Sequence, residues 1–266
     1  ALDVPVEVRF GTSFGLLLRA NADLTTYAPT DSSSYSNNVY FFKAAALLKT
    51  SRLYIKAGIR PTWDNSKLKV LPDVLVDYHI QEKKIIVTAG WVGHVRKNTY
   101  QYLVSQNPWI NQPVSQFNTR ITEVYGGVKG TLANSFNYRI QGGYLEQLGV
   151  PLFTNFVKPS LFSVLRESKL QAFHWQAEMG FVLQDKFNAS GKLDIYNFIG
   201  QQNYAGAWHL IPVQLTAALR WQPTKKIMVK SDLYAWQGPL FETTLNTNRL
   251  PAAFDLNAGV EFKVHE

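Results

Sequence analysis

Catalysis or metal binding in this chain would depend on few side chains, because its 266 residues include five histidines and no cysteine. The best-placed pair is His174 and Glu178, but four residues of extended strand separate them by about 13 Å. A Ser-His-acid triad needs three groups in mutual contact, and none can be identified. The sequence also lacks glycine-rich phosphate motifs and histidine spacings typical of metal sites. We therefore expect no enzyme activity, no bound metal and no cofactor.

Charged side chains alternate with apolar ones along many segments, which places charges of both signs on one face. In residues 136–144, for example, Arg139 lies between Tyr138 and Ile140. If these segments form a barrel wall, the charges line the lumen, where they either pair and close a narrow interior or border a water-filled path through a wide one. The predicted lumen-lining residues are Lys56, Arg60, Glu123, Lys129, Arg139, His174, Glu178 and Arg220.

One long link, residues 96–120, combines aromatic side chains, amides and cations. This mixture is suited to stacking on sugar rings or to contacting a partner protein, and exposed loops often carry binding residues. The alternative is that the link folds inward and plugs its own lumen. The candidate ligand-binding or partner-binding residues are Tyr100, Tyr102, Trp109, Arg96 and Arg120.

The elements that position these residues are strands, because alternation with a period of two recurs while helical spacing is scarce. No stretch has the about 20 apolar residues of a membrane-spanning helix. Many candidate strands reach the length of about 9–11 residues that crosses a bilayer at a steep tilt. The candidate strands cover residues 4–10, 14–27, 39–48, 53–60, 68–79, 85–95, 121–131, 136–146, 170–184, 187–198, 210–222, 227–236 and 254–264.

The links between these segments alternate between tight and long without exception. Tight links fall at 11–13, 49–52, 81–84, 132–135, 185–186 and 223–226, and longer ones at 28–38, 61–67, 96–120, 147–169, 199–209 and 237–253. Outer-membrane barrels sort short periplasmic turns and longer extracellular loops in this way, whereas a soluble sandwich has no reason to. The sequence thus predicts an all-β fold, a transmembrane antiparallel up-and-down β-barrel of about 12 to 14 strands.

The odd number of candidate strands leaves two architectures open, since single-chain bacterial barrels have an even number. Either residues 1–12 form an extra strand or periplasmic segment beside a closed barrel, or the chain is part of a larger barrel. The second is favoured because Val264-His265-Glu266 stands where a turn should begin. We expect a single domain over residues 1–266 and no plug domain.

The expected surroundings are a lipid bilayer and lipopolysaccharide. The formal charge of +8 can contact lipopolysaccharide phosphates or an anionic solute, whereas the chain has no basic cluster of the kind that binds nucleic acid. Other outer-membrane proteins or lipoproteins are further candidate partners. Interfacial aromatic belts are predicted near the tight links at Tyr78, Phe136, Trp221 and Phe262, and near the long links at Trp91 and Tyr144.

Several short strings resemble a known family. They are KAGIRP at 56–61, AGWVG at 89–93, NPW at 107–109, GGVKG at 126–130, PLF at 151–153 and FDLNAGVEF at 254–262. These strings are similar to the barrel portion of the TonB-dependent-receptor-like outer-membrane proteins of Bacteroidota, from about residue 39 onward. The resemblance implies an integral protein of the bacterial outer membrane.

Three functions from different classes fit these observations. A transport or permeation barrel is favoured, because the resembling family is associated with transport. The first alternative is a barrel that carries nothing and acts as a scaffold or partner in an outer-membrane complex. The second is a soluble all-β binding protein, against which the sorting of link lengths argues.

Overall fold

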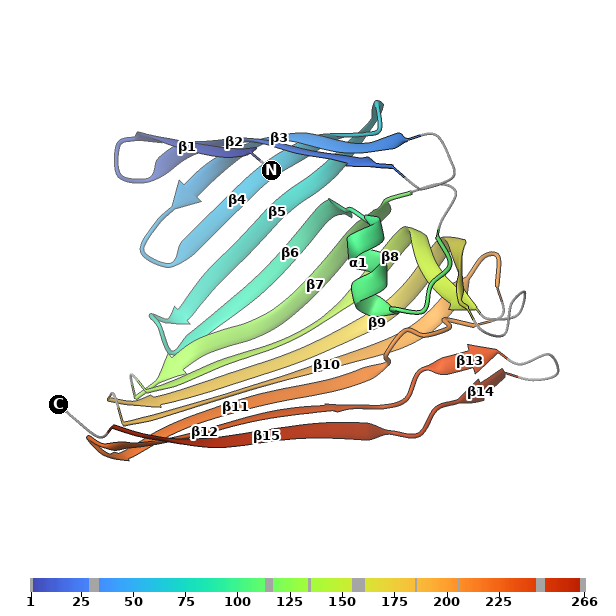
Figure 1. Ribbon diagram of the computed structural model, residues 1–266. Coiled ribbons are helices and arrows are strands. Elements are labelled where there is room, and N and C mark those ends of the chain that lie inside the picture. Colours follow the sequence, from blue (N-terminus) through green and yellow to red (C-terminus); the bar gives the residue numbers. More distant parts are fainter. Residues whose placement is uncertain are drawn as a thin grey trace.

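The chain folds as one long, strongly curved antiparallel sheet with a short helix on its concave side (Figure 1). The computed structural model describes residues 2–28, 34–112, 117–133, 135–154, 161–184, 186–204, 206–242 and 247–263. Its thirteen strands lie side by side in chain order, from β1 through β12 to β15. All neighbours in this sheet pair antiparallel, as an up-and-down barrel wall requires.

The strands match the thirteen predicted segments and are mostly longer. Val264 at the predicted end of the last segment lies outside the described residues, as does Asp185 in a predicted tight link. The sheet consists of β1 (Leu2–Phe10), β2 (Phe14–Tyr27), β3 (Tyr35–Lys49), β4 (Leu53–Asp64), β5 (Lys67–Gln81), β6 (Ile85–Arg96), β7 (Thr119–Leu132), β8 (Phe136–Thr154), β9 (Ser163–Leu183), β10 (Phe187–Gln201), β11 (Val213–Thr224), β12 (Ile227–Trp236) and β15 (Ala253–Phe262).

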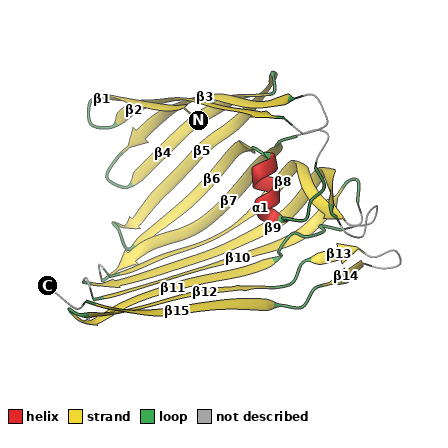
Figure 2. Cartoon of the chain, in the orientation of Figure 1, coloured by secondary structure: helices red, strands yellow, loops and turns green. Residues whose placement is uncertain are grey.

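Residues 2–10 belong to the sheet rather than to a separate segment. Strand β1 pairs with β2 from Leu2↔Ala22 to Phe10↔Phe14, so the interpretation that leaves this segment outside the wall is wrong. In the part of the chain that is described, no ladder joins β1 to β15, and these two strands form the edges of the sheet. The sheet is therefore an arc rather than a closed cylinder (Figure 2).

Three elements were not predicted. Helix α1 (Tyr100–Gln106) lies in the link after β6, and β13 (Leu240–Glu242) and β14 (Thr247–Arg249) form a small separate hairpin before β15. Figure 2 shows the helix inside the arc and the hairpin beyond it. No helix among the described residues is long and apolar enough to cross a membrane.

Link lengths follow the predicted alternation with one exception. Strands β4 and β5 are joined by Asn65 and Ser66 alone, so the prediction of a long link at 61–67 is wrong. Both residues have left-handed backbone angles, φ 48° and 71°, which match the right-handed twist of a two-residue hairpin. Strands β8 and β9 also extend far into the predicted link at 147–169. The remaining links at that end are longer than the tight turns at the other.

The two faces of the sheet have inverted polarity compared with a soluble protein. Ile140 and Trp175 are 60% and 56% exposed, whereas Lys43 and Asp73 are 7% and 5% exposed. Apolar side chains form a row in register across four neighbouring strands, comprising Trp91, Val124 and Phe173, which are exposed, and Tyr144, which is partly exposed. A face this apolar would drive association in water but suits the hydrocarbon of a bilayer.

Among the described residues, the apolar cores lie near the loop end. Val150, Leu152 and Leu170 of β8 and β9 pack with Ala207 and Trp208 from the link after β10. A second cluster joins Leu103 of α1 to Ile110 and Phe153. These clusters fix the links onto the extended β8–β9 hairpin, which is where the sheet rises beyond the regular wall.

We predict that Ile140→Arg on the apolar face destabilises the inserted protein by about 2–4 kcal/mol, because the cation would lie in hydrocarbon. The matched change Gln141→Arg, one residue along the same strand, should have much less effect because that position faces the polar side. Unfolding of the full-length protein from lipid vesicles by urea measures both. Equal stability of the two variants would contradict the assignment of faces, since an exposed Ile→Arg change in a soluble protein is nearly neutral.

Candidate functional site

The concave face is identified by its contact with α1. The ring of Tyr27 in β2 lies 5.1 Å from the ring of Tyr100 in the helix, so residues of β2 in phase with Tyr27, including Arg19, face inward. Arg19 pairs in register with Lys43 of β3. The polar face of the sheet is therefore the concave one.

Most of the predicted lumen charges are paired, and their partners lie on nearby strands. Asp73 of β5 receives ion pairs from Lys43 at 2.7 Å and Lys56 at 2.9 Å. Further along the wall, Lys129 pairs with Asp77 at 2.8 Å. These contacts neutralise charge along the wall and do not cross the arc.

Two predicted cations have other surroundings. Arg60 stacks on the ring of Phe41, with 4.5 Å from its Cζ to the ring centre, and donates from Nη1 to the Gly93 carbonyl at 3.3 Å. Arg220 is exposed and lies in register between Asn188 and Lys230. Arg139 and Glu178 form a looser pair at 3.8 Å.

His174 is the centre of a cluster on the concave face. Its Nδ1 lies 2.8 Å from Glu123 and its Nε2 lies 3.2 Å from Asp194. The imidazole stacks on the Tyr196 ring at 4.3 Å, with 3° between the planes. Both ring nitrogens are engaged by carboxylates, so His174 has no nitrogen left to activate a serine. Among the described residues, no group of three or more histidine or acidic side chains has the arrangement of a metal site.

Residues 97–112 fold inward, which is the second of the two predicted alternatives. Lys97 donates from Nζ to Asp23 Oδ1 and Thr25 Oγ1, both at 2.6 Å, and so reaches β2 from the end of β6. Thr99 caps α1 by accepting the Tyr102 amide at 3.2 Å. The segment spans the concave side from β2 to the β8–β9 hairpin (Figure 1).

The five predicted loop residues do not form one group. Arg96 lies over the Tyr102 ring, 5.7 Å from its centre, on the concave side. Trp109 is 67% exposed. Arg120 pairs in register with Val95 and is out of phase with Arg96, so it faces the convex side. Their role in binding stays a prediction, with Arg120 separated from the rest.

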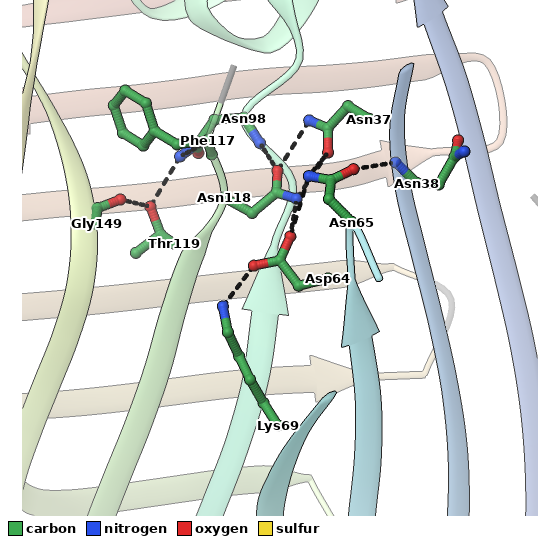
Figure 3. Close-up of polar contacts among 10 residues, drawn as sticks. All are labelled: Asn37, Asn38, Asp64, Asn65, Lys69, Asn98, Phe117, Asn118, Thr119 and Gly149. Carbon is green, nitrogen blue, oxygen red and sulfur yellow. Dashed lines mark hydrogen bonds and ion pairs between the residues drawn. The ribbon is translucent and has the colours of Figure 1, made fainter. Parts of the chain in front are cut away.

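A buried network of amides, which we call the loop tether, holds this segment in place (Figure 3). Asn118 donates to Asn37 at 2.7 Å and Asp64 at 2.6 Å. Its oxygen accepts from the Asn37 side chain at 2.9 Å and the Asn98 backbone at 3.2 Å. The carboxylate of Asp64 is also paired with Lys69 at 2.5 Å. The tether links β3, β4 and β5 to the residue before β7 and to the start of the inward segment.

A second anchor acts on the link after β10. Glu167 is fully buried, and its carboxylate accepts backbone N–H groups of Lys169, Gln202, Asn203 and Tyr204 at 3.0–3.1 Å. Such charge-assisted bonds are stronger than neutral ones. Neither anchor was predicted, because the partners are distant in sequence. The only signal was the presence of asparagines beside the strand ends, where they often bond to backbone.

Comparisons with known proteins define the class of fold. The sequence matches no known family and no curated protein. Solved structures that it resembles include the siderophore receptor PirA from Acinetobacter baumannii, with a TM-score of 0.69, 8% identity, and coverage of 99% of this chain and 48% of that one. The ferric enterobactin receptor PfeA from Pseudomonas aeruginosa has a TM-score of 0.64 and 10% identity, and the match covers 99% of this chain and 46% of that one. The copper transporter OprC has a TM-score of 0.63 and 11% identity, and the match covers 99% of this chain and 48% of that one.

The chain thus has the fold of a transmembrane up-and-down β-barrel, as the sequence predicted. It resembles the barrels of receptors and transporters and spans about half of each of these chains. At this identity, the likeness establishes the fold alone.

We predict that Asn118→Ala releases the inward segment. The change removes four hydrogen bonds of the tether and leaves the buried Asn37 and Asp64 under-satisfied, at a cost of about 2–4 kcal/mol. Chymotrypsin cleavage at Tyr100 and Tyr102 in the folded protein should accelerate by about tenfold or more.

The matched control is Asn111→Ala, whose side-chain oxygen accepts only the adjacent Gln112 amide among the described contacts. Cleavage that is unchanged in Asn118→Ala, or equally fast in both variants, would show that the tether does not hold the segment.

Protonation of His209 should loosen the link after β10. The ring lies edge-on to Phe153 and Phe162, with centroid distances of 6.2 and 5.3 Å, and burial lowers the pKa of His209. Its neutral form is therefore favoured by folding, and this stability is complete above the unfolded pKa of about 6.5. It is lost as pH falls through the lower folded pKa.

Hydrogen exchange of residues 206–212, corrected for intrinsic rates, should accelerate between pH 7.5 and pH 5. His209→Gln should remove most of this pH dependence. Persistence of the full pH effect in His209→Gln would assign it to another group.

Proposed function

We propose that this chain forms part of the wall of an integral barrel in the bacterial outer membrane, and that the barrel carries a hydrophilic solute as TonB-dependent-receptor-like proteins do. The observation that carries the proposal is the concave face, where charges are buried yet paired along the wall. Pairs such as Lys43–Asp73 and Lys129–Asp77 keep the face polar without filling the interior. A wall of this kind suits a wide, wet passage more than a closed one.

We propose further that additional strands complete the wall. The outer edges of β1 and β15 have no ladder partner in the described residues, and unpaired backbone groups are costly in hydrocarbon. That this chain spans 46–48% of its structural neighbours supports a larger barrel. The partners then include the lipid bilayer and lipopolysaccharide, together with other envelope proteins at the loop end.

The inward segment is the proposed selectivity element. It crosses the concave side near the mouth, and Arg96 and Tyr102 lie on it. The named neighbours are receptors for siderophores and a transporter for copper, so metal-bearing solutes are the class to test first. We propose no catalytic role for these side chains.

A scaffold that transports nothing is the second candidate, because one feature favours a protein contact. Trp109 is 67% exposed beside the mouth, and exposed tryptophans are frequent anchors of interfaces. In that case the lumen stays closed to solutes whatever the state of the inward segment.

The test is osmotic swelling of liposomes that contain the full-length protein, with sugars, amino acids and ferric siderophores as solutes. Replacing residues 98–112 by a Gly-Ser linker of equal length should open the mouth and raise permeation several-fold. The control replaces residues 240–249, which carry the β13–β14 hairpin outside the arc.

The outcomes separate the three functions. Permeation that rises only in the 98–112 replacement supports transport. Insertion into liposomes without permeation in any form would favour the scaffold, and failure to insert would favour the soluble binding protein.

A further inference from the structure

The tight-turn end of the sheet carries a row of cations that outnumber the carboxylates there, which we call the basic rim. Its members occupy the turns β3–β4, β5–β6, β9–β10 and β11–β12 and the residue after β15: Arg52, Lys83, Lys84, Lys186, Lys225, Lys226 and Lys263. Against these seven cations, the same turns contain two carboxylates, Glu82 and Asp185, of which Asp185 lies outside the described residues. The rim therefore has a strong net positive charge along one edge of the sheet.

Within the part of the chain that the structure describes, the cations of the rim form no ion pairs, unlike most charges of the concave face. All seven are exposed, and none forms a salt bridge with a described carboxylate. Turn contacts involve their backbones instead: the Lys84 carbonyl accepts the Tyr138 hydroxyl at 2.8 Å, and the Lys226 carbonyl accepts the Lys263 amide at 2.8 Å. The backbone is thus held while the charged groups are left for an external partner.

Directly beside the rim, the convex face carries exposed rings. Each belongs to the apolar phase of its strand and lies within a few residues of a tight turn. These rings are Phe10, Phe14, Tyr78, Trp221 and Phe262, with exposed fractions of 59%, 62%, 46%, 47% and 62%. Rings at this position suit the boundary between hydrocarbon and headgroups, and the stems of adjacent lysines can extend so that the ammonium reaches the phosphates.

We infer that the basic rim binds the phosphates of the phospholipid leaflet that meets the tight turns, an inference that rests on the proposed membrane location. In outer-membrane barrels the short turns face the periplasm, where the leaflet consists of phospholipid. The cations follow the sheet edge from β3 to β15, which matches a plane of lipid phosphates. A discrete acidic protein would instead be expected to meet a compact patch. Anionic phospholipid is therefore selected at this end, and it fixes the depth of the wall in the bilayer.

The experiment measures lipid selectivity of the full-length protein in phosphatidylcholine bilayers by electron spin resonance. Spin-labelled phosphatidylglycerol and phosphatidylcholine are compared as probes of the protein-bound lipid. We expect a preference for phosphatidylglycerol of about three- to fivefold at low salt, since one interfacial cation contributes about that much. Salt at 1 M should reduce it.

Two rim variants, Lys83→Gln/Lys84→Gln and Lys225→Gln/Lys226→Gln, should each lower the preference. The matched control Lys67→Gln/Arg249→Gln removes the same charge from exposed positions at the loop end of the sheet and should leave it unchanged. A preference that is absent, unaffected by the rim variants or equally reduced by the control would overturn the inference.

Two further results distinguish failure of the lipid-binding inference from failure of the proposed function. A protein that is extracted from liposomes by urea, and so does not insert, overturns the proposed function together with the rim. An inserted protein whose rim variants lose an acidic periplasmic protein, while lipid selectivity is unchanged, assigns the cations to protein binding and overturns only the inference.

Discussion

Backbone hydrogen bonding in a medium without water is the constraint on which this structure depends. A strand in hydrocarbon must pair on both sides, and the simplest solution joins each strand to the next in the chain. Strands β1 to β12 and β15 follow that order without a crossover. The tight turns at one end are a consequence, because antiparallel neighbours can be joined by very few residues. The longer links lie at the other end of the sheet, where they can form structures of their own.

Charge on the concave face follows a second rule. A buried carboxylate or ammonium is stabilised only when it is paired and hydrogen-bonded, and the curvature of the sheet brings side chains of next-but-one strands together. Asp73 of β5 meets Lys43 of β3 in this way, and Glu123 of β7 meets His174 of β9. Because most of these groups find their partner along the wall, they need no partner across the interior. A polar wall and an unfilled lumen are therefore compatible.

The sequence predicted the wall well and the loop end poorly, for a physical reason. In the wall, one face suits contact with lipid and the other contacts polar groups, so the alternation is visible in strands such as β8, β11 and β15. Beyond residue 147, β8 is covered on both faces by links, with Val150 and Leu152 against Trp208 and Phe153 against Leu103. The period of two is then lost, which is why the sequence predicts a link where β8 continues.

Other elements of the loop end were missed for related reasons. Helix α1 has only seven residues, too few to show a helical period, and its Thr99 cap is recognisable only once the helix is known. Pairing in the tether joins Asn37 to Asn118, which are 81 residues apart, and no local pattern encodes such a contact. The face occupied by the predicted lumen charges is easier to predict, because the phase of a residue in a strand decides which face it occupies.

The two edge strands, β1 and β15, also carry inward charges that pair with a neighbouring strand. On β1, Arg19 of β2 pairs with Asp3, and on β15, Glu261 pairs with Lys230 of β12; in both cases the inward charges are satisfied within the sheet. The outward residues of these strands, such as Val4 and Val260, stay apolar and exposed. At each edge the outer backbone groups have no ladder partner among the described residues, whereas the side chains of these ion pairs are satisfied. A strand added there needs only antiparallel pairing and the same alternation, so the wall can be continued without new side-chain chemistry at the seam.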